Sequence, residues 1–390
     1  MGQRGVGQRG MRHHDTSEDP GVRRIGLDYL RGFVIVMVVL HHAVLAYCAF
    51  GHFNPQHYMW SSAPIVDAER WWGFDILVLF NDSYFMPLMF LLSGLFVRPS
   101  LGRKGPQTYL MDRVRRLALP FALAVLTIIP LAFYPSYRMT GATGGFGAFW
   151  VQTVSDGPWP SGPPWFLAVL FGFDVVAVAV WPLLARLDLR RQGASFVFLA
   201  TVSVVAYLPL LITFGPNPWL AWGPFSIQGS RILLYAAYFF VGVAAGPALR
   251  IPAGRPVMLA VALFAVLLAA QICHLRVPTL MPPDSWLILH GLALALFCAA
   301  ATRTLLAVFA QFQRRSAVWD SLSANAYGIY LLHYPFVVWG QYALLDWPIG
   351  PIPKAAGVFT AALTLSWGCS AGASALLRTA PRSVVGFGRG

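Results

Sequence analysis

The 390-residue chain is poor in charged residues and in cysteine. Only 11% of its residues are charged, whereas a soluble domain carries about a quarter, so the chain has too few charges to cover a water-facing surface. Its four cysteines, Cys48, Cys273, Cys298 and Cys369, lie in or beside apolar runs and form no metal-ligand pair. We therefore expect buried free thiols and no bound metal.

Apolar residues are abundant and come in long runs. They make up 57% of the chain, and the runs approach the ~20 residues that cross a bilayer as a helix. The alternating segments of roughly ten residues that build an outer-membrane barrel are absent. Because backbone groups in lipid must be bonded within their own segment, helices are the expected spanning form. The predicted fold class is an all-α membrane protein, a polytopic helix bundle.

The runs predict about ten transmembrane helices, with both termini on the cytoplasmic side. Residues 1–22 are polar and predict a disordered cytoplasmic segment, and residues 381–390 a cytoplasmic tail. One transmembrane domain is predicted between them, over 23–380. The first apolar run is long enough to span, so no cleaved signal peptide is expected. The expected spans are 27–50, 73–97, 116–135, 164–185, 195–214, 230–249, 256–275, 285–308, 322–345 and 356–378.

The basic residues behind the net charge of +13 alternate between the connections. Of the 28 Lys and Arg, all but five lie in the first span, the two ends or the even-numbered connections, as the positive-inside rule requires of an even number of spans. They do not cluster on a soluble module, so we expect membrane lipids, and no nucleic acid, as partners. The five exceptions are Arg70, Arg138, Arg231, Arg276 and Lys354.

Ionisable residues at membrane depth are the first candidates for function, because each is costly in lipid. Arg31 and His42 share one face of the first span and lie ~16 Å apart along its axis. Arg31 is expected near the cytoplasmic boundary, and His42 in the middle or outer half of the bilayer. His41 points ~100° away. The alternative is that both histidines bond to neighbouring helices and Arg31 is a boundary anchor.

The second span carries a carboxylate at a similar depth. Counted back from Arg98, Asp82 lies ~24 Å into the bilayer, so it could orient an imidazole such as that of His42 and raise its basicity. Pro87 is expected to bend this helix. The alternative is a structural, hydrogen-bonded aspartate.

Two further spans hold polar groups. In the ninth, Tyr330 and His333 are three residues apart and share a face, with helix–helix hydrogen bonding as the alternative. Asp174 is an intramembrane acid in the fourth span. At the start of the third span, Arg113 and Arg116 could bind phosphate or an anionic head group, or could simply mark the cytoplasmic side.

Four motifs follow one another along residues 23–380. They are Leu27-Asp28-Tyr29-Leu30-Arg31-Gly32 through to His42, Phe85 to Phe96 with Ser93-Gly94, Arg113-Val114-Arg115-Arg116 before Pro120, and Tyr327 to Pro335 with Tyr330 and His333. In this order they resemble the motifs of the type-3 membrane acyltransferase family, and most of all those of its glucans biosynthesis protein C-like subgroup. One departure is Pro164, where relatives often have His before Trp-Phe-Leu.

The resemblance implies transfer of an acyl group, acetyl or succinyl, from cytoplasmic acyl-coenzyme A to a hydroxyl of an extracytoplasmic glycan or lipid. Acyl-coenzyme A is then a co-substrate, no cofactor is bound, and the location is the bacterial cytoplasmic membrane. We expect His42 to be the general base, with Asp82 and Arg31 beside it in the catalytic set. Arg113 and Arg116 would bind the donor, with Tyr330, His333 and Ser93 supporting or on the acceptor side.

Other classes of protein and other mechanisms stay open. A secondary transporter or flippase could use the intramembrane His, Asp and Arg as a proton relay, although the chain shows no internal repeat of the kind many transporters have. A non-catalytic scaffold is a third reading, and an acyl-histidine intermediate a variant of the enzymatic one. The acyl group, the acceptor and the oligomeric state are left open by the resemblance.

Overall fold

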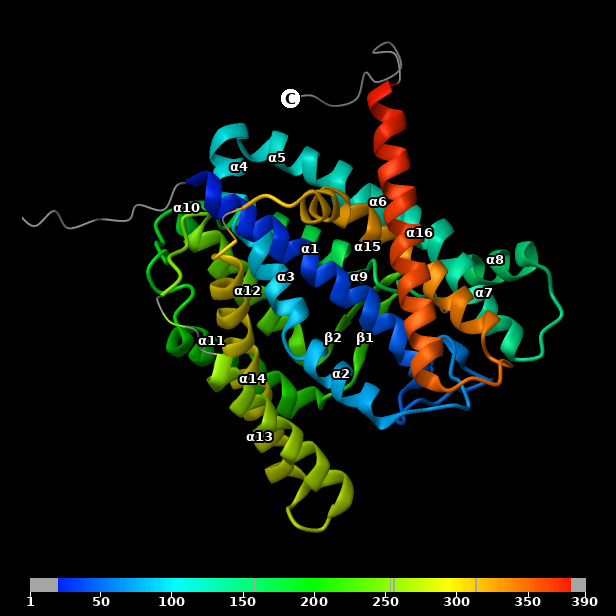
Figure 1. The fold of residues 1–390 in the computed structure, drawn as a ribbon. Helices are drawn as coiled ribbons and strands as arrows, with labels where there is room; N and C mark the ends of the chain where they lie inside the picture. Colours follow the sequence, from blue (N-terminus) through cyan, green and yellow to red (C-terminus); the bar gives the residue numbers. More distant parts are fainter. Residues whose placement is uncertain (1–19, 158, 253, 255–256, 313, 380–390) are drawn as a thin grey trace, which may run out of the picture.

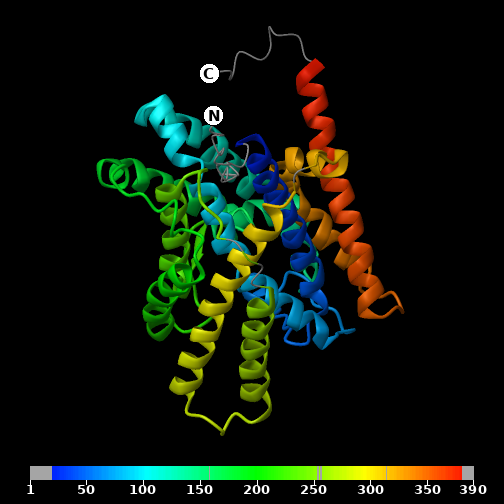
Figure 2. The same ribbon diagram turned by 60° about the vertical axis from the view of Figure 1, so that its left-hand side comes forward.

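The computed structural model describes residues 20–157, 159–252, 254, 257–312 and 314–379. The expected tail 381–390 lies outside the described residues, as does the expected amino-terminal segment 1–22 except for residues 20–22, which begin the first helix. Figures 1 and 2 show a bundle of helices in which the start of α1 and the end of α16 lie on the same side. A helical hairpin, α13 with α14, projects from the opposite side.

The described residues are mostly helical, and one small antiparallel β-hairpin lies between α11 and α12. The hairpin pairs β1 (Trp219–Trp222) with β2 (Phe225–Gln228). The α-helices are α1 (Pro20–Val44), α2 (Trp72–Asp82), α3 (Phe85–Gly94), α4 (Val97–Lys104), α5 (Pro106–Arg113), α6 (Leu119–Leu123), α7 (Ile129–Met139), α8 (Phe146–Ser155), α9 (Trp165–Ala179), α10 (Trp181–Leu184), α11 (Phe196–Phe214), α12 (Ile232–Ala245), α13 (Val257–Arg276), α14 (Pro283–Phe309), α15 (Ala317–Ala343) and α16 (Pro351–Thr379). Two π-helical turns, Val114–Ala118 and Ala124–Ile128, join α5, α6 and α7. Short 3₁₀ turns cover Leu45–Tyr47, Tyr58–Trp60 and Gly229–Arg231.

Several of these helices are apolar enough to cross a membrane, so the chain is a multi-pass membrane protein. Within the described ranges, six helical segments meet both length and hydropathy requirements, and two shorter apolar helices accompany them. Each of the ten expected spans overlaps a helix. The six are Ile25–Tyr47, Trp72–Lys104, Pro106–Met139, Phe196–Phe214, Val257–Arg276 and Pro283–Phe309, and the two shorter ones are Trp165–Ala179 and Gly229–Ala245.

The structure also departs from the expected elements. The helix of the third span begins at Pro106 rather than at 116, because the polar segment α5 continues directly into it. Helix α8 and the β-hairpin were not predicted, so the described fold is helical but not purely α. Hydropathy detects long apolar runs. It missed α5, α8 and the β-hairpin because they are short, polar or aromatic segments in the connections.

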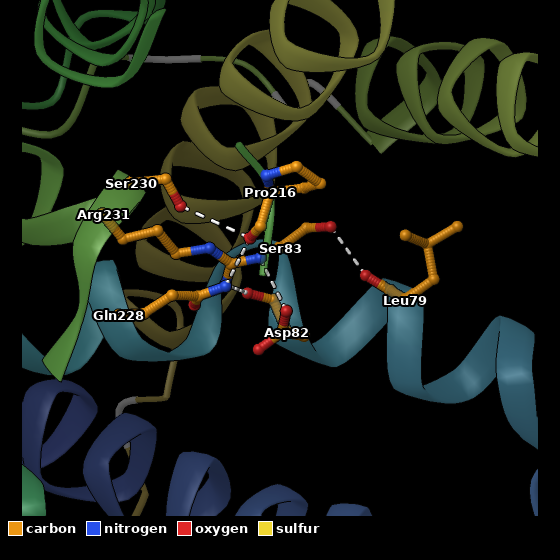
Figure 3. Close-up of polar contacts among 7 residues, drawn as sticks. All are labelled: Leu79, Asp82, Ser83, Pro216, Gln228, Ser230 and Arg231. Atoms are coloured by element: carbon orange, nitrogen blue, oxygen red, sulfur yellow. Dashed lines mark hydrogen bonds and ion pairs between the residues drawn. The ribbon is translucent and has the colours of Figure 1, made fainter. Parts of the chain in front are cut away.

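The second span is broken at mid-length. Helix α2 ends at Asp82 and α3 starts at Phe85. Pro87 causes the break, since its ring clashes with the carbonyl of Ser83, four residues earlier, and it offers no N–H to that carbonyl. The hydroxyl of Ser83 turns back and donates to the carbonyl of Leu79 at 2.6 Å (Figure 3). The expected bend at Pro87 therefore takes the form of an interruption that sets Asp82 at a helix end.

Helix α3 packs against α12 with almost no space between the backbones. A Cβ added to Gly94 would lie 2.2 Å from the carbonyl oxygen of Phe239, and one added to Gly242 would lie 2.3 Å from that of Leu91. Small residues permit this close approach between membrane helices. Ser93, next to Gly94, is thereby held at a fixed depth in the bundle.

Prolines in the third span leave backbone carbonyls that other helices satisfy. The carbonyls four residues before Pro120, Pro130 and Pro135 cannot receive the usual helical hydrogen bond, and an unsatisfied carbonyl in lipid is costly. Each accepts an aromatic side-chain donor instead. The pairs are Tyr327 Oη to Arg116 O at 2.6 Å, Trp150 Nε1 to Leu126 O at 2.8 Å, and Trp339 Nε1 to Leu131 O at 2.9 Å.

Candidate functional site

A cavity of about 400 Å³ is lined by cationic side chains from α1, α4, α5 and the π turn after α5. We call it the arginine cavity. Two carboxylates and several hydroxyls share its wall with five cations, so its charge is positive. Its charged and hydroxyl-bearing residues are Arg31, Ser93, Ser100, Arg103, Lys104, Asp112, Arg113, Arg116, Asp174, Tyr327 and Tyr330.

Arg113 is held by a buried carboxylate and by an aromatic ring. Its Nε lies 3.3 Å from Oδ2 of Asp174, whose side chain is 1% exposed. The guanidinium also lies over the ring of Tyr109, 4.8 Å from its centroid, and the hydroxyl of Tyr109 donates to Asp174. Asp174 thus has a definite position in the structure: it fixes Arg113 at the edge of the cavity.

Arg31 is held more loosely. It forms an ion pair with Asp28 at 3.3 Å, and both side chains are about half exposed, at 42% and 52%. Its guanidinium lies 5.8 Å from the ring centroid of Phe96. An exposed pair of this kind contributes little to stability, so Arg31 can readily exchange Asp28 for an anionic ligand.

A second, larger cavity of about 910 Å³ contains His42. We call it the histidine cavity. Its wall comes from α1 and the connection after it, the break between α2 and α3, α7, α8, the connection before α9, the β-hairpin, α12 and α15. Along α1 the wall changes from one cavity to the other within one turn, since Ile35 lines the arginine cavity and Val38 the histidine cavity. Arg31 and His42 therefore serve different cavities on the same helix.

His42 lies beside His333. Their ring centroids are 5.4 Å apart. His333 is fully buried, and its Nδ1 contacts the carbonyls of Tyr330 at 2.7 Å and Ile329 at 3.2 Å. A nitrogen that contacts two carbonyls must carry the proton, which leaves Nε2 of His333 as an acceptor. Within the described residues neither this Nε2 nor Nδ1 of His42 has a hydrogen-bond partner.

Tyr330 lines both cavities. It is 7% exposed, and its hydroxyl donates to the carbonyl of Pro163 in the connection before α9. Gly162 has a positive φ of +50°, which brings that carbonyl toward α15. The side chain of Tyr330 is therefore a shared wall between the arginine cavity and the histidine cavity.

Asp82 lines the histidine cavity, but its hydrogen bonds run to Arg231 and not to His42 (Figure 3). Sequence reasoning missed this partner, although Arg231 was one of only five basic residues outside the cytoplasmic connections and lies inside an expected span, 230–249. Arg103 and Lys104 were also missed as cavity residues, because a cytoplasmic connection is where the positive-inside rule already expects them.

The apolar helices define a multi-pass membrane protein, and two groups of its ionisable residues line internal cavities. The acyltransferase domain family, acyltransferase 3, matches residues 24–371, and the chain belongs to that family. Family membership supports an acyltransferase over a transporter or a scaffold. No curated protein and no solved structure matches the chain.

Proposed function

We propose that the chain is a membrane O-acyltransferase that takes an acyl group from acyl-coenzyme A in the arginine cavity and gives it to an acceptor hydroxyl in the histidine cavity. The observation that supports this most directly is that Tyr330 lines both cavities. In this proposal a thioester that enters among the arginines meets the side chain of Tyr330 on its way to the space beside His42.

The donor side follows from charge. Phosphate groups prefer bidentate guanidinium partners, and Arg31, Arg113 and Arg116 share one cavity with Arg103 and Lys104. By the positive-inside rule this end faces the cytoplasm, where acyl-coenzyme A is made. Both chain ends lie on that side, and the membrane is the bacterial cytoplasmic one.

The chemistry is general-base catalysis by His42. A neutral imidazole removes the proton of the acceptor hydroxyl as its oxygen attacks the thioester carbonyl. The carbon–sulfur bond then breaks, and the proton passes from the imidazolium to the departing thiolate of coenzyme A. The products are the acyl ester and free coenzyme A.

His333 is the group that orients His42 in this proposal. A hydrogen bond from Nδ1 of His42 to Nε2 of His333 would pair two nitrogens that otherwise lack partners and leave Nε2 of His42 free as the base. This replaces the earlier interpretation of Asp82, which has its own cation. Ser93 supports the donor from the wall of the arginine cavity.

The proposed acyl group is acetyl or succinyl, and the proposed acceptor is a glycan or another carbohydrate, as the resemblance to the glucans biosynthesis protein C-like subgroup implies. Mass spectrometry of envelope glycans from cells with and without the chain should show the loss of one ester mass increment. That increment identifies the acyl group directly.

His42→Gln tests the base. Purified in detergent, the variant should bind coenzyme A as the wild type does and lose about 100-fold or more of its transfer rate. His52→Gln is the control, because His52 lies in the connection after α1 and lines neither cavity. Full transfer by the His42 variant would remove the proposed mechanism, and solute movement without consumption of acyl-coenzyme A would favour transport.

A further inference from the structure

Asp82 is held at the end of α2 with part of its carboxylate open to the histidine cavity. Its side chain is 40% exposed, whereas that of Arg231 is 6% exposed. Figure 3 shows Arg231 reaching from beside the β-hairpin to the break between α2 and α3. The cation is buried behind the carboxylate, and the carboxylate faces the space that an acceptor would occupy.

Arg231 fixes Asp82 at two points. Its NH2 donates to Oδ2 of the carboxylate at 2.6 Å, and its NH1 donates to the backbone carbonyl of Asp82 at 2.7 Å. That carbonyl is free because α2 ends there, and a cation is favoured at a helix C-terminus. The other carboxylate oxygen, Oδ1, accepts no hydrogen bond from the described residues and is available to a ligand.

The β-hairpin keeps Arg231 in place. Gln228, the last residue of β2, donates from Nε2 to the carbonyl of Pro216 at 2.7 Å, and Ser230 Oγ donates to the same carbonyl at 3.4 Å. Gln228 directly precedes the turn Gly229–Arg231 that carries the arginine, and Ser230 belongs to that turn, so both bonds tie the turn to Pro216 (Figure 3). Because the turn holds Arg231 in place, and Arg231 holds Asp82, the Asp82 side chain loses little conformational freedom when it binds a ligand.

The rest of the histidine cavity sets the kind of molecule that fits. Its described lining contains no Lys or Arg, and its acidic residues are Asp82 and Asp156. An anionic acceptor would therefore meet like charge. The indoles of Trp60, Trp159, Trp165 and Trp219 also line it, and flat aromatic faces beside a carboxylate suit a ring that is apolar on its faces and carries hydroxyls on its edge.

We propose that Asp82 is an acceptor-binding residue that receives hydroxyl protons of an uncharged, hydroxyl-rich ligand of the oligosaccharide class, and that Arg231 is its positioning residue. The inference rests on the proposed function, since it takes the histidine cavity as the acceptor site. It gives Asp82 a role that does not pass through His42.

The test compares neutral and anionic probes on the purified full chain. The neutral probe is a pool of glucose oligomers, and the anionic probe is the same pool oxidised at carbon 6 to uronates. In Asp82→Asn, affinity for the neutral pool should fall about tenfold, because a hydrogen bond to a charged acceptor is lost. Affinity for the uronate pool should rise. The ratio of the affinity for the neutral pool to that for the uronate pool therefore falls for two reasons.

Arg231→Lys tests positioning, because it keeps the charge but cannot hold both oxygens in the same geometry. It should weaken binding of the neutral pool in the wild-type background and have little further effect in the Asp82→Asn background. A purely structural role for Arg231 would give equal losses in both backgrounds. Binding of coenzyme A in the arginine cavity reports that each variant is folded.

Asp284→Asn is the matched control, since it removes the same charge from the start of α14, away from either cavity. An unchanged neutral-to-anionic preference in Asp82→Asn overturns the inference. So does a wild-type chain that transfers acyl groups but binds no oligosaccharide, and in that case the proposed function stands. A chain that binds oligosaccharide through Asp82 but consumes no acyl-coenzyme A supports the subsite and rejects the acyl transfer.

Discussion

At the scale of single residues, the ion pair between Arg113 and Asp174 allows the effects of Arg113 on stability and on donor binding to be measured separately. Asp174 is almost completely buried, and a buried charge that loses its partner destabilises a protein by about 3–5 kcal/mol. Arg113→Gln should therefore lower both thermal stability and affinity for coenzyme A. Adding Asp174→Asn should restore most of the stability without restoring affinity. Thermal unfolding and equilibrium binding, measured side by side on the single and double variants, check this.

Arg116 offers a cleaner probe of the donor site. It is exposed, and its side chain forms no ion pair among the described residues, so Arg116→Gln should leave stability almost unchanged. Affinity for coenzyme A should fall about tenfold, as expected for one lost charge-assisted contact. Arg138→Gln at the end of α7 is the control. Equal affinity in both variants would remove Arg116 from the donor site.

The sequence predicts some of the site residues and cannot predict their partners. Arg31, Arg113 and Arg116 were expected together, because cytoplasmic position and motif order both indicate it, and they do share a cavity. Asp82 and Arg231 are 149 residues apart in sequence. Their contact depends on how α2, the β-hairpin and α12 pack, which no local pattern contains. The depth of Asp82 suggested His42 as its partner, but depth alone does not give direction.

At the scale of elements, the third span depends on side chains from elsewhere. Trp339 of α15 donates to the carbonyl that Pro135 leaves free. Trp339→Phe should lower the free energy of unfolding by about 1–3 kcal/mol, since the carbonyl then has no hydrogen-bond donor in an apolar environment. Trp347→Phe is the control, because Trp347 is 58% exposed and its indole makes no hydrogen bond within the described residues. Equal stability of the two variants would contradict this account.

The contact between α3 and α12 gives a second prediction for elements. Gly94→Ala would place a methyl group 2.2 Å from a backbone oxygen of α12, so the helices must separate, and stability should fall by about 1–3 kcal/mol. Gly102→Ala in α4 meets nothing within 4 Å and should be neutral or slightly stabilising. Thermal unfolding of the two alanine variants compares a helix contact with simple helix propensity.

Element boundaries were predictable where hydropathy changes sharply and not elsewhere. All ten expected spans overlap helices, because long apolar runs leave no other choice in lipid. Helix α5 was missed because its residues are polar, and the β-hairpin because Trp219–Trp222 and Phe225–Gln228 are too short to show a period. Pro87 predicted a bend, but the position of the break follows from the carbonyl four residues earlier.

At the scale of the whole molecule, Tyr330 is the side chain that the arginine cavity and the histidine cavity share. Tyr330→Ala removes the shared wall and should raise hydrolysis of acyl-coenzyme A in the absence of acceptor, because water in the histidine cavity then reaches the thioester. Tyr330→Phe keeps the ring, loses the bond to Pro163 and should have a smaller effect. The ratio of hydrolysis to transfer is the measurement. A ratio unchanged in Tyr330→Ala would mean that the cavities are separated by other groups.

The shared wall has a consequence for the cell. In the proposed arrangement the nucleotide part of the donor stays on the inner face and only the acyl group passes Tyr330. An outer compartment that holds no energy-rich thioesters could then be supplied with esters without the export of a single molecule of coenzyme. The transfer reaction itself moves the acyl group across the membrane. The cleavage of the thioester on the cytoplasmic side drives it.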